Sequence, residues 1–113
     1  MQEFIMKKVV KFGGSSLASA EQFKKVGNII HADESRVYVV PSAPGKRFDG
    51  DTKVTDMLYG CYDLAAKGKD FSSEFDAIKE RYYGIINDLG LDLSLDKEFE
   101  TIKACFIGKA GRD

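Results

Sequence analysis

The amino-acid sequence predicts an α/β fold built on a parallel βαβ unit. Two short apolar runs, residues 6–12 and 36–40, have the composition and length of β-strands. Between them, residues 20–32 carry apolar side chains at the spacing of an α-helix. Two strands joined through one helix are expected to lie parallel and next to each other, or nearly so, with a right-handed crossover.

The boundaries of these first elements can be read from the residues that flank them. A buried strand is expected over residues 6–12, because the run is rich in valine and stops at a pair of glycines. Residues 19–22, Ser-Ala-Glu-Gln, have the form of a capping box, in which Ser19 begins the helix and Gln22 reaches back to it. The second strand, 36–40, is again almost continuously apolar.

The rest of the sequence predicts three more helices. After a polar, turn-rich stretch, Thr52 is the expected N-cap of a helix that Gly68 ends. A long helix follows from residues 71–73 to Gly90, and Ser94 begins the last one. These last two helices are expected to form an antiparallel hairpin with a packing role. Their apolar positions are Phe75, Ile78, Tyr82, Ile86 and Leu89 in one helix and Leu95, Phe99, Ile102 and Phe106 in the other.

Length and composition are those of an ordinary globular protein of one domain at most. Of the 113 residues, 43% are hydrophobic and 31% are charged, and 17 basic against 18 acidic side chains leave a net charge of −1. This balance does not indicate a nucleic-acid partner, and no apolar run approaches the ~20 residues of a membrane helix. A cytoplasmic location is therefore expected. Cys61 and Cys105 both fall on apolar helix positions, which predicts reduced core residues rather than a disulfide or a zinc site.

The stretch from Lys11 to Ser16, Lys-Phe-Gly-Gly-Ser-Ser, has the layout of a strand that delivers the backbone to a phosphate. Gly13 and Gly14 can adopt positive φ and carry no Cβ, so successive N–H groups can converge on an anion. Ser15 adds a hydroxyl donor, and Lys11 brings a positive charge that could offset charge on a transferred phosphoryl group. An ordinary strand-to-helix turn with a surface lysine remains the alternative.

A second loop, residues 41–46, is expected beside the first. Parallel strands end at the same edge of a sheet, and ligands of open α/β sheets bind outside the carboxyl ends of the strands. At the start of the following helix, Thr55 could hold a carboxylate or phosphate, whereas Asp56 is better explained by the favourable position of a carboxylate at a helix N-terminus. His31, the only histidine, is expected to interact with the C-terminal end of its helix rather than to act in catalysis.

Three blocks carry a resemblance to a known family: residues 11–16 (Lys-Phe-Gly-Gly-Ser-Ser), 39–46 (Val-Val-Pro-Ser-Ala-Pro-Gly-Lys) and 53–58 (Lys-Val-Thr-Asp-Met-Leu). Together they resemble the beginning of the aspartokinases, a branch of the amino acid kinase family. The resemblance implies the N-terminal part of a three-layer α/β/α fold on a mostly parallel sheet. It also implies regulatory ACT domains later in the chain.

The implied activity is the phosphorylation of the side-chain carboxylate of L-aspartate by ATP with Mg²⁺, giving 4-phospho-L-aspartate on the route to lysine, threonine and methionine. No metal ligand is assigned. The residues that match the family's site positions are Lys11 for the transferred phosphoryl group, Gly13, Gly14 and Ser15, with Lys11, for the ATP phosphates, and Ser42 and Thr55 for L-aspartate.

The same resemblance implies that the sequence is part of a longer kinase. An Arg-Gly-Glu block that binds aspartate, the nucleotide-binding half and the regulatory domains are expected after residue 113. Residues 1–113 are therefore expected to be the N-terminal portion of an incomplete catalytic domain, without kinase activity by itself. The complete protein is expected to be a homo-oligomer.

Two other classes of function stay open from the sequence. The first is a kinase of the same fold that acts on glutamate, N-acetylglutamate, carbamate or a nucleotide; the stretch from Ser42 to Thr55 argues against it. The second is a non-enzymatic interaction module, in which the helical hairpin binds a partner and the glycine pair is only a turn. A folded monomer that ignores MgATP would favour the interaction module.

Overall fold

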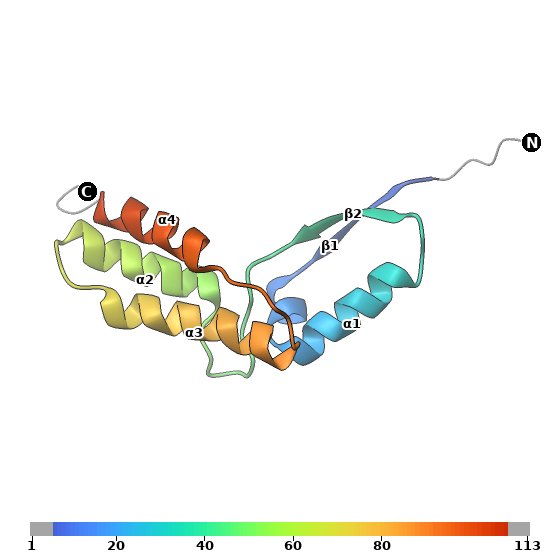
Figure 1. The fold of residues 1–113 in the computed structure, drawn as a ribbon, viewed down its shortest axis with the longest axis horizontal. Helices are drawn as coiled ribbons and strands as arrows, with labels where there is room; N and C mark the ends of the chain where they lie inside the picture. Colours follow the sequence, from blue (N-terminus) through green and yellow to red (C-terminus); the bar gives the residue numbers. More distant parts are fainter. Residues whose placement is uncertain (1–5, 109–113) are drawn as a thin grey trace, which may run out of the picture. The chain divides into compact units, whose positions relative to one another are not determined.

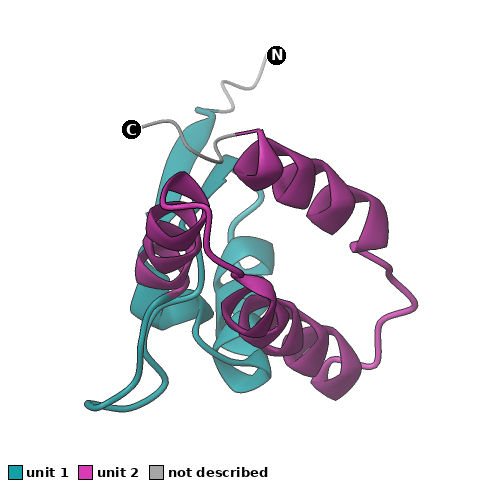
Figure 2. Cartoon of the chain, turned by 90° about the vertical axis from the view of Figure 1, so that its left-hand side faces the viewer, with its two compact units in different colours: residues 1–53 teal, residues 54–113 magenta. Residues whose placement is uncertain are grey.

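The computed structural model describes residues 6–108. The chain divides into two compact units, residues 1–53 and 54–113, which Figure 2 distinguishes by colour. Unit 1 contains the strands and the first helix, and unit 2 contains the remaining helices.

Unit 1 is the expected parallel βαβ unit. It runs through β1 (Lys8–Phe12), a short 3₁₀ helix η1 (Gly14–Leu17), α1 (Ala20–His31) and β2 (Arg36–Pro41), as Figure 1 shows. The strands pair in parallel as a two-stranded sheet, with Lys11 opposite Val40 and Phe12 opposite Pro41. The prediction of two adjacent parallel strands is confirmed.

The start of α1 and the turn into β2 are fixed by short-range polar contacts. Ser19 is the N-cap of α1, and its hydroxyl accepts a hydrogen bond of 3.4 Å from the Gln22 N–H, as predicted. After α1, Asp33 accepts hydrogen bonds from the Ser35 N–H (2.9 Å) and hydroxyl (2.6 Å) and forms an ion pair of 2.9 Å with Lys8. The Ser35 hydroxyl and then Lys8 hold the pKa of Asp33 well below its usual range.

The strands are not buried, which corrects the prediction of a buried strand over residues 6–12. Val9 is 67% exposed, and in β2 Val37 and Val40 are 50% and 47% exposed. Val10 and Phe12 on the other face of β1 are half-buried. The reason is that this sheet has two strands, so both strands are edge strands and most of their apolar surface has nothing from unit 1 packed against it.

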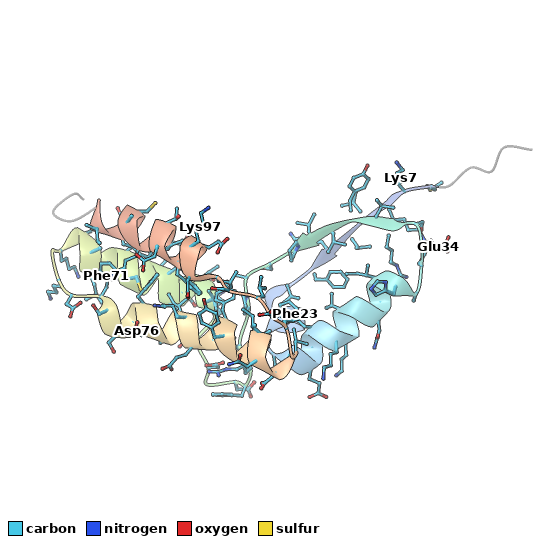
Figure 3. All side chains as sticks on the ribbon, in the orientation of Figure 1. Lys7, Phe23, Glu34, Phe71, Asp76 and Lys97 are labelled. Carbon is cyan, nitrogen blue, oxygen red and sulfur yellow. The ribbon has the colours of Figure 1, made fainter. Side chains whose placement is uncertain are left out.

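Unit 2 is a helical unit made of α2 (Val54–Ala66), α3 (Ser72–Asp88) and α4 (Asp96–Ile107). Its core includes the fully buried side chains of Val54, Cys61 and Ile78. Rings connect α3 and α4, and Figure 3 shows Phe71 at the start of α3. The ring pairs lie 5.5–6.3 Å apart and are Phe71–Phe75, Phe71–Phe106, Phe75–Phe99, Phe75–Phe106, Tyr82–Phe99 and Tyr83–Phe99.

These ring contacts establish the direction of the hairpin. Phe71, at the start of α3, contacts Phe106 at the end of α4, whereas Tyr83, later in α3, contacts Phe99 near the start of α4. The Tyr83 hydroxyl also accepts a hydrogen bond of 3.0 Å from the Leu95 N–H, directly before α4, and donates to Asp96. The predicted antiparallel hairpin is confirmed, and α2 packs against both of its helices.

Helices α2 and α3 end where the glycines predicted them to end. Gly68 and Gly90 have φ values of 69° and 68°, in the left-handed region that favours glycine. The following residues, Lys69 and Leu91, donate hydrogen bonds of 2.8 and 3.1 Å back to the carbonyls of Leu64 and Ile86. The start of α2 differs from the prediction: it begins at Val54, so Thr52 does not directly precede the helix.

The two cysteines differ in their surroundings. Both are free thiols. Cys61 is fully buried, as predicted, and burial raises the pKa of its thiol. Cys105 is exposed, so its assignment as a core residue is wrong. The helical spacing placed Cys105 on an apolar face, but the face that α4 buries runs through Phe99, Ile102 and Phe106, and Cys105 lies beside it.

Candidate functional site

Two loops leave the carboxyl ends of β1 and β2 and are joined by their main chains. The Ser42 N–H donates a hydrogen bond of 3.1 Å to the Phe12 carbonyl, and the Gly45 N–H donates one of 2.7 Å to the Gly14 carbonyl. The loop that follows β1 and the loop that follows β2 therefore lie side by side, as expected for parallel strands. This edge of unit 1 is the candidate site.

Lys11 lies on β1, two residues before the first loop. Side chains alternate along a strand, so Lys11 shares a face with Val9, and both are exposed, whereas Phe12 points to the half-buried face. Its partner in the register is Val40, two residues before Ser42. Lys11 is thus carried by the strand that leads into the first loop, and its register partner lies close to the start of the second loop.

The first loop uses its glycines differently from the prediction. Gly13 is extended, with φ −74° and ψ 170°, and within residues 6–108 the only positive φ values belong to Gly68 and Gly90. Gly14 begins η1, and the Ser16 N–H donates to the Gly13 carbonyl at 3.1 Å. The first N–H groups of a 3₁₀ turn have no acceptor inside the turn, so those of Gly14 and Ser15 could serve an anion.

The predicted aspartate contacts, Ser42 and Thr55, come from different units. Ser42 is exposed and directly follows β2, where its N–H bond to Phe12 fixes its backbone beside β1. Thr55 is the second residue of α2 and is also exposed, next to Asp56 in the first turn. Unit 1 alone therefore brings together Lys11, the first loop and Ser42.

Gly45 was not predicted as a site residue, although it lies in the loop expected over residues 41–46; it is buried together with Pro44. A Cβ built on Gly45 would lie 2.5 Å from the Gly14 carbonyl carbon and 2.8 Å from the Ser15 nitrogen. The two loops therefore touch through their backbones, and Gly45 permits the contact by lacking a side chain. Its position directly after a proline was the only signal, and it indicated a turn.

An ion pair that the sequence did not reveal, between Arg47 and Asp51, spans the loop after residue 46. The Arg47 guanidinium binds Asp51 through two hydrogen bonds, Nε to Oδ2 at 2.6 Å and Nη2 to Oδ1 at 3.0 Å. The Arg47 N–H also donates to Asp51 Oδ2 at 3.0 Å. This arrangement holds the pKa of Asp51 well below its usual range, chiefly through the side-chain hydrogen bond, and raises the pKa of Arg47. The turn-rich stretch is thus held by hydrogen bonds between its own residues.

Neither a metal cluster nor a membrane helix is found in residues 6–108. No three His, Cys, Asp or Glu side chains in this part of the chain are grouped to hold a metal ion. None of the helices there is long and apolar enough to cross a membrane.

Comparison with known proteins relates this arrangement to a family of kinases. Aspartokinase 3 of Bacillus subtilis (strain 168) is 48% identical over 88 residues, which cover 78% of this chain and 19% of that protein. The bifunctional aspartokinase/homoserine dehydrogenase of Haemophilus influenzae is 32% identical over 120 residues, covering 93% of this chain and 14% of that protein.

A crystal structure of Clostridium acetobutylicum aspartate kinase, described as an allosteric enzyme, superposes with a TM-score of 0.85 at 44% identity. The match covers 88% of this chain and 23% of that one, and it confirms the predicted fold class. The chain thus spans between 14% and 23% of the length of these three proteins. Residues 6–107 match the model of the amino acid kinase family. The chain therefore belongs to the amino acid kinase family.

Proposed function

We propose that this chain forms part of the active site of an aspartate kinase, which transfers the γ-phosphoryl group of ATP to the side-chain carboxylate of L-aspartate. The product is 4-phospho-L-aspartate, as the first step of lysine, threonine and methionine biosynthesis. The similarity to aspartokinases at 44–48% identity supports this substrate. The single observation that carries the proposal is the pairing of the two loops beside the Lys11 strand.

The chemistry of this transfer fits the residues at the site. A carboxylate that attacks a γ-phosphate brings two negatively charged groups together, so the site must supply positive charge and N–H donors. The aspartate side chain has an ordinary pKa near 3.9 and needs no general base at neutral pH. Lys11 and the N–H groups of the first loop are donors of the required kind, and no histidine lies in either loop.

The proposed residues divide the work between the two substrates. Lys11 stabilises the transferred phosphoryl group and, with the loop of Gly13, Gly14 and Ser15, holds the phosphates of ATP. Ser42 and Thr55 contact L-aspartate. Because Ser42 is joined through Phe12 to the strand that carries Lys11, the acceptor side of the reaction would be held close to the donor side.

ATP would enter with Mg²⁺, which neutralises phosphate charge during transfer. In residues 6–108 no cluster of acidic side chains is built to hold the ion by itself. This fits an ion bound mainly through the nucleotide phosphates, as Mg²⁺ commonly is. Lys11 and the loop amides would then act on the phosphate oxygens directly.

The chain is proposed to be the N-terminal portion of the catalytic domain and to be inactive alone, since its relatives are several times longer. We use "complete kinase" for the polypeptide that joins this chain to the remaining length of its relatives. The complete kinase is proposed to be a homo-oligomer. A cytoplasmic location fits the two free thiols of the chain.

A hydroxylamine-trapping assay tests the function. Acyl phosphates react with hydroxylamine, so ATP-dependent aspartyl hydroxamate reports the proposed product. The assay is run on the 113-residue chain and on the complete kinase, with L-aspartate, glutamate, N-acetylglutamate, carbamate and nucleotides as acceptors. Carbamate and nucleotides are followed by ADP release instead. Aspartyl hydroxamate from the complete kinase but not from the chain alone is the expected result.

The other outcomes identify the alternatives. Turnover of a different acceptor would assign another activity within the same family. A complete kinase that is folded but silent with every acceptor, and that does not bind MgATP, would contradict the kinase proposal and favour an interaction module.

A further inference from the structure

The contact between the two loops is unusually close for segments so distant in the sequence. A Cβ placed on Gly45 would lie 2.5 Å from the carbonyl carbon of Gly14, 2.8 Å from its oxygen and 2.8 Å from the Ser15 nitrogen. All three are main-chain atoms, which cannot rotate aside as the end of a flexible side chain can. Any residue larger than glycine at position 45 must therefore push the loops apart.

The requirement for glycine at this position arises from proximity and not from backbone conformation. Gly45 does not have a positive φ, in contrast to Gly68 and Gly90. It is buried, and its N–H donates the 2.7 Å hydrogen bond to Gly14. From the other side, a Cβ on Gly14 would lie 3.1 Å from the Ala43 carbonyl oxygen and 3.2 Å from the Gly45 Cα. The contact is thus tight in both directions.

The neighbouring Gly13 shows the opposite surroundings. A Cβ built there meets nothing within 4 Å, and the residue is exposed. The two glycines of the first loop are therefore distinct: Gly14 faces the second loop, and Gly13 faces open space. Of these two glycines, only Gly14 is in close contact with the second loop.

We propose that Gly45 is a positioning residue for phosphoryl transfer: its backbone contact with Gly14 sets the distance between the loop assigned to ATP phosphates and Ser42, assigned to L-aspartate. This inference rests on the proposed function. Gly45 touches neither substrate in this role. Two hydrogen bonds, from Ser42 to Phe12 and from Gly45 to Gly14, fix both ends of the short segment that carries the acceptor contact.

The test compares turnover with binding in the complete kinase. In the variant Gly45→Ala each loop keeps its own ligand groups, but the loops are displaced relative to each other. A misplacement of about 1 Å can lower the rate about 100-fold, so we expect kcat to fall about 100-fold while the KM values for ATP and aspartate change less than about threefold. A role in folding alone would lower the midpoint of unfolding without this separation of kcat from KM.

The matched control is Gly50→Ala, in the following loop. Its Cβ would meet nothing within 4 Å, and its φ is not positive. We expect kcat and both KM values to remain at the wild-type level. Equal losses in Gly45→Ala and Gly50→Ala would contradict the specific role of Gly45.

A second variant keeps the proposal testable if Gly45→Ala fails to fold. One glycine inserted between Ala43 and Pro44 lengthens the segment between the two hydrogen bonds without forcing an atom into the Gly14 contact, and loop lengthening of this kind costs little stability. It should also lower kcat while leaving the KM values nearly unchanged. Wild-type kcat in a folded Gly45→Ala or insertion variant would overturn the proposal, as would raised KM values at unchanged kcat.

Failure of the underlying function has a different signature. If the complete kinase phosphorylates another carboxylate, the assignment of aspartate is wrong, but the same kcat and KM comparison with that acceptor still decides the role of Gly45. If it phosphorylates nothing, both proposals fall together.

Discussion

The two units of this chain differ in what they carry: unit 1 holds all the candidate site residues except Thr55, whereas unit 2 holds most of the core. The buried apolar residues of unit 1 are small or few, namely Leu17, Ala18, Ala20 and Val26, while the valines of β2 are exposed. Unit 2 instead buries Phe75, Ile78, Ile85, Ile86 and Phe99. Side-chain packing therefore organises unit 2, whereas main-chain hydrogen bonds between the two loops organise the edge of unit 1 that holds the candidate site.

Because most of the core lies in unit 2, the largest loss of stability is expected from a substitution in that unit. Phe75 is 4% exposed and contacts three other rings, so Phe75→Ala should lower the free energy of unfolding by about 3–5 kcal/mol. The control is Phe48→Ala in unit 1, where the ring is 62% exposed and the change should stay within about 0.5 kcal/mol. Urea unfolding of the chain, followed by circular dichroism, measures both. Similar losses for the two phenylalanines would contradict the division between the units.

The next largest effect is expected on turnover, from a substitution in unit 1. Lys11→Ala in the complete kinase should lower turnover by about 10²–10³-fold, because it removes the donor proposed to stabilise the transferred phosphoryl group. The exposed position of Lys11 predicts an intact fold. The control Lys25→Ala removes an exposed lysine from α1 and should leave turnover unchanged. A Lys11→Ala variant that keeps more than about a tenth of wild-type turnover would reject this role.

A third prediction uses glycines to separate conformation from proximity. Gly68 in unit 2 has φ 69°, so Gly68→Ala should destabilise the chain by about 1–2 kcal/mol. Gly60, inside α2, has open space at its Cβ position, so Gly60→Ala should instead stabilise by about 0.5–1 kcal/mol. Thermal unfolding of both variants tests these opposite signs. Neither change should alter turnover, in contrast to Gly45→Ala, because neither glycine belongs to the proposed site.

The smallest expected effect is a pH dependence in unit 1. The pKa of Asp33 is lowered in the folded chain, so its contribution to stability is present above the ordinary aspartate pKa of about 3.9 and is lost as the pH falls below it. Asp33→Asn should reduce stability at pH 7 and weaken the loss between about pH 4 and pH 2. The effect is small because the Asp33 side chain is 32% exposed, so solvent screens its ion pair with Lys8.

Backbone amide NMR signals of both units, followed during acid titration, measure this dependence. Asp76→Asn, a change at an exposed position of α3 in unit 2, is the control and should leave the acid response of unit 1 unchanged. An acid response of unit 1 that Asp33→Asn does not change would contradict the assigned ion pair with Lys8.

Local sequence patterns determined the order and type of the elements. The Ser19 cap, the stops at Gly68 and Gly90 and the parallel pairing of the strands all follow from residues close together in the chain or from a general rule of chain connection. The same patterns, with the family resemblance, placed Lys11, the first glycine loop and Ser42 at one edge of the sheet. Backbone preferences act over a few residues, so they can be read without the fold.

Only the tertiary structure decided burial and close approach. The exposed valines of β2 and the exposed Cys105 show that an apolar pattern does not fix what covers a residue. The contact of Gly45 with Gly14 depends on the register of β1 and β2 and on the path of both loops, which no local pattern records. Burial and contact are properties of pairs of segments, and a linear sequence does not state which segments will meet.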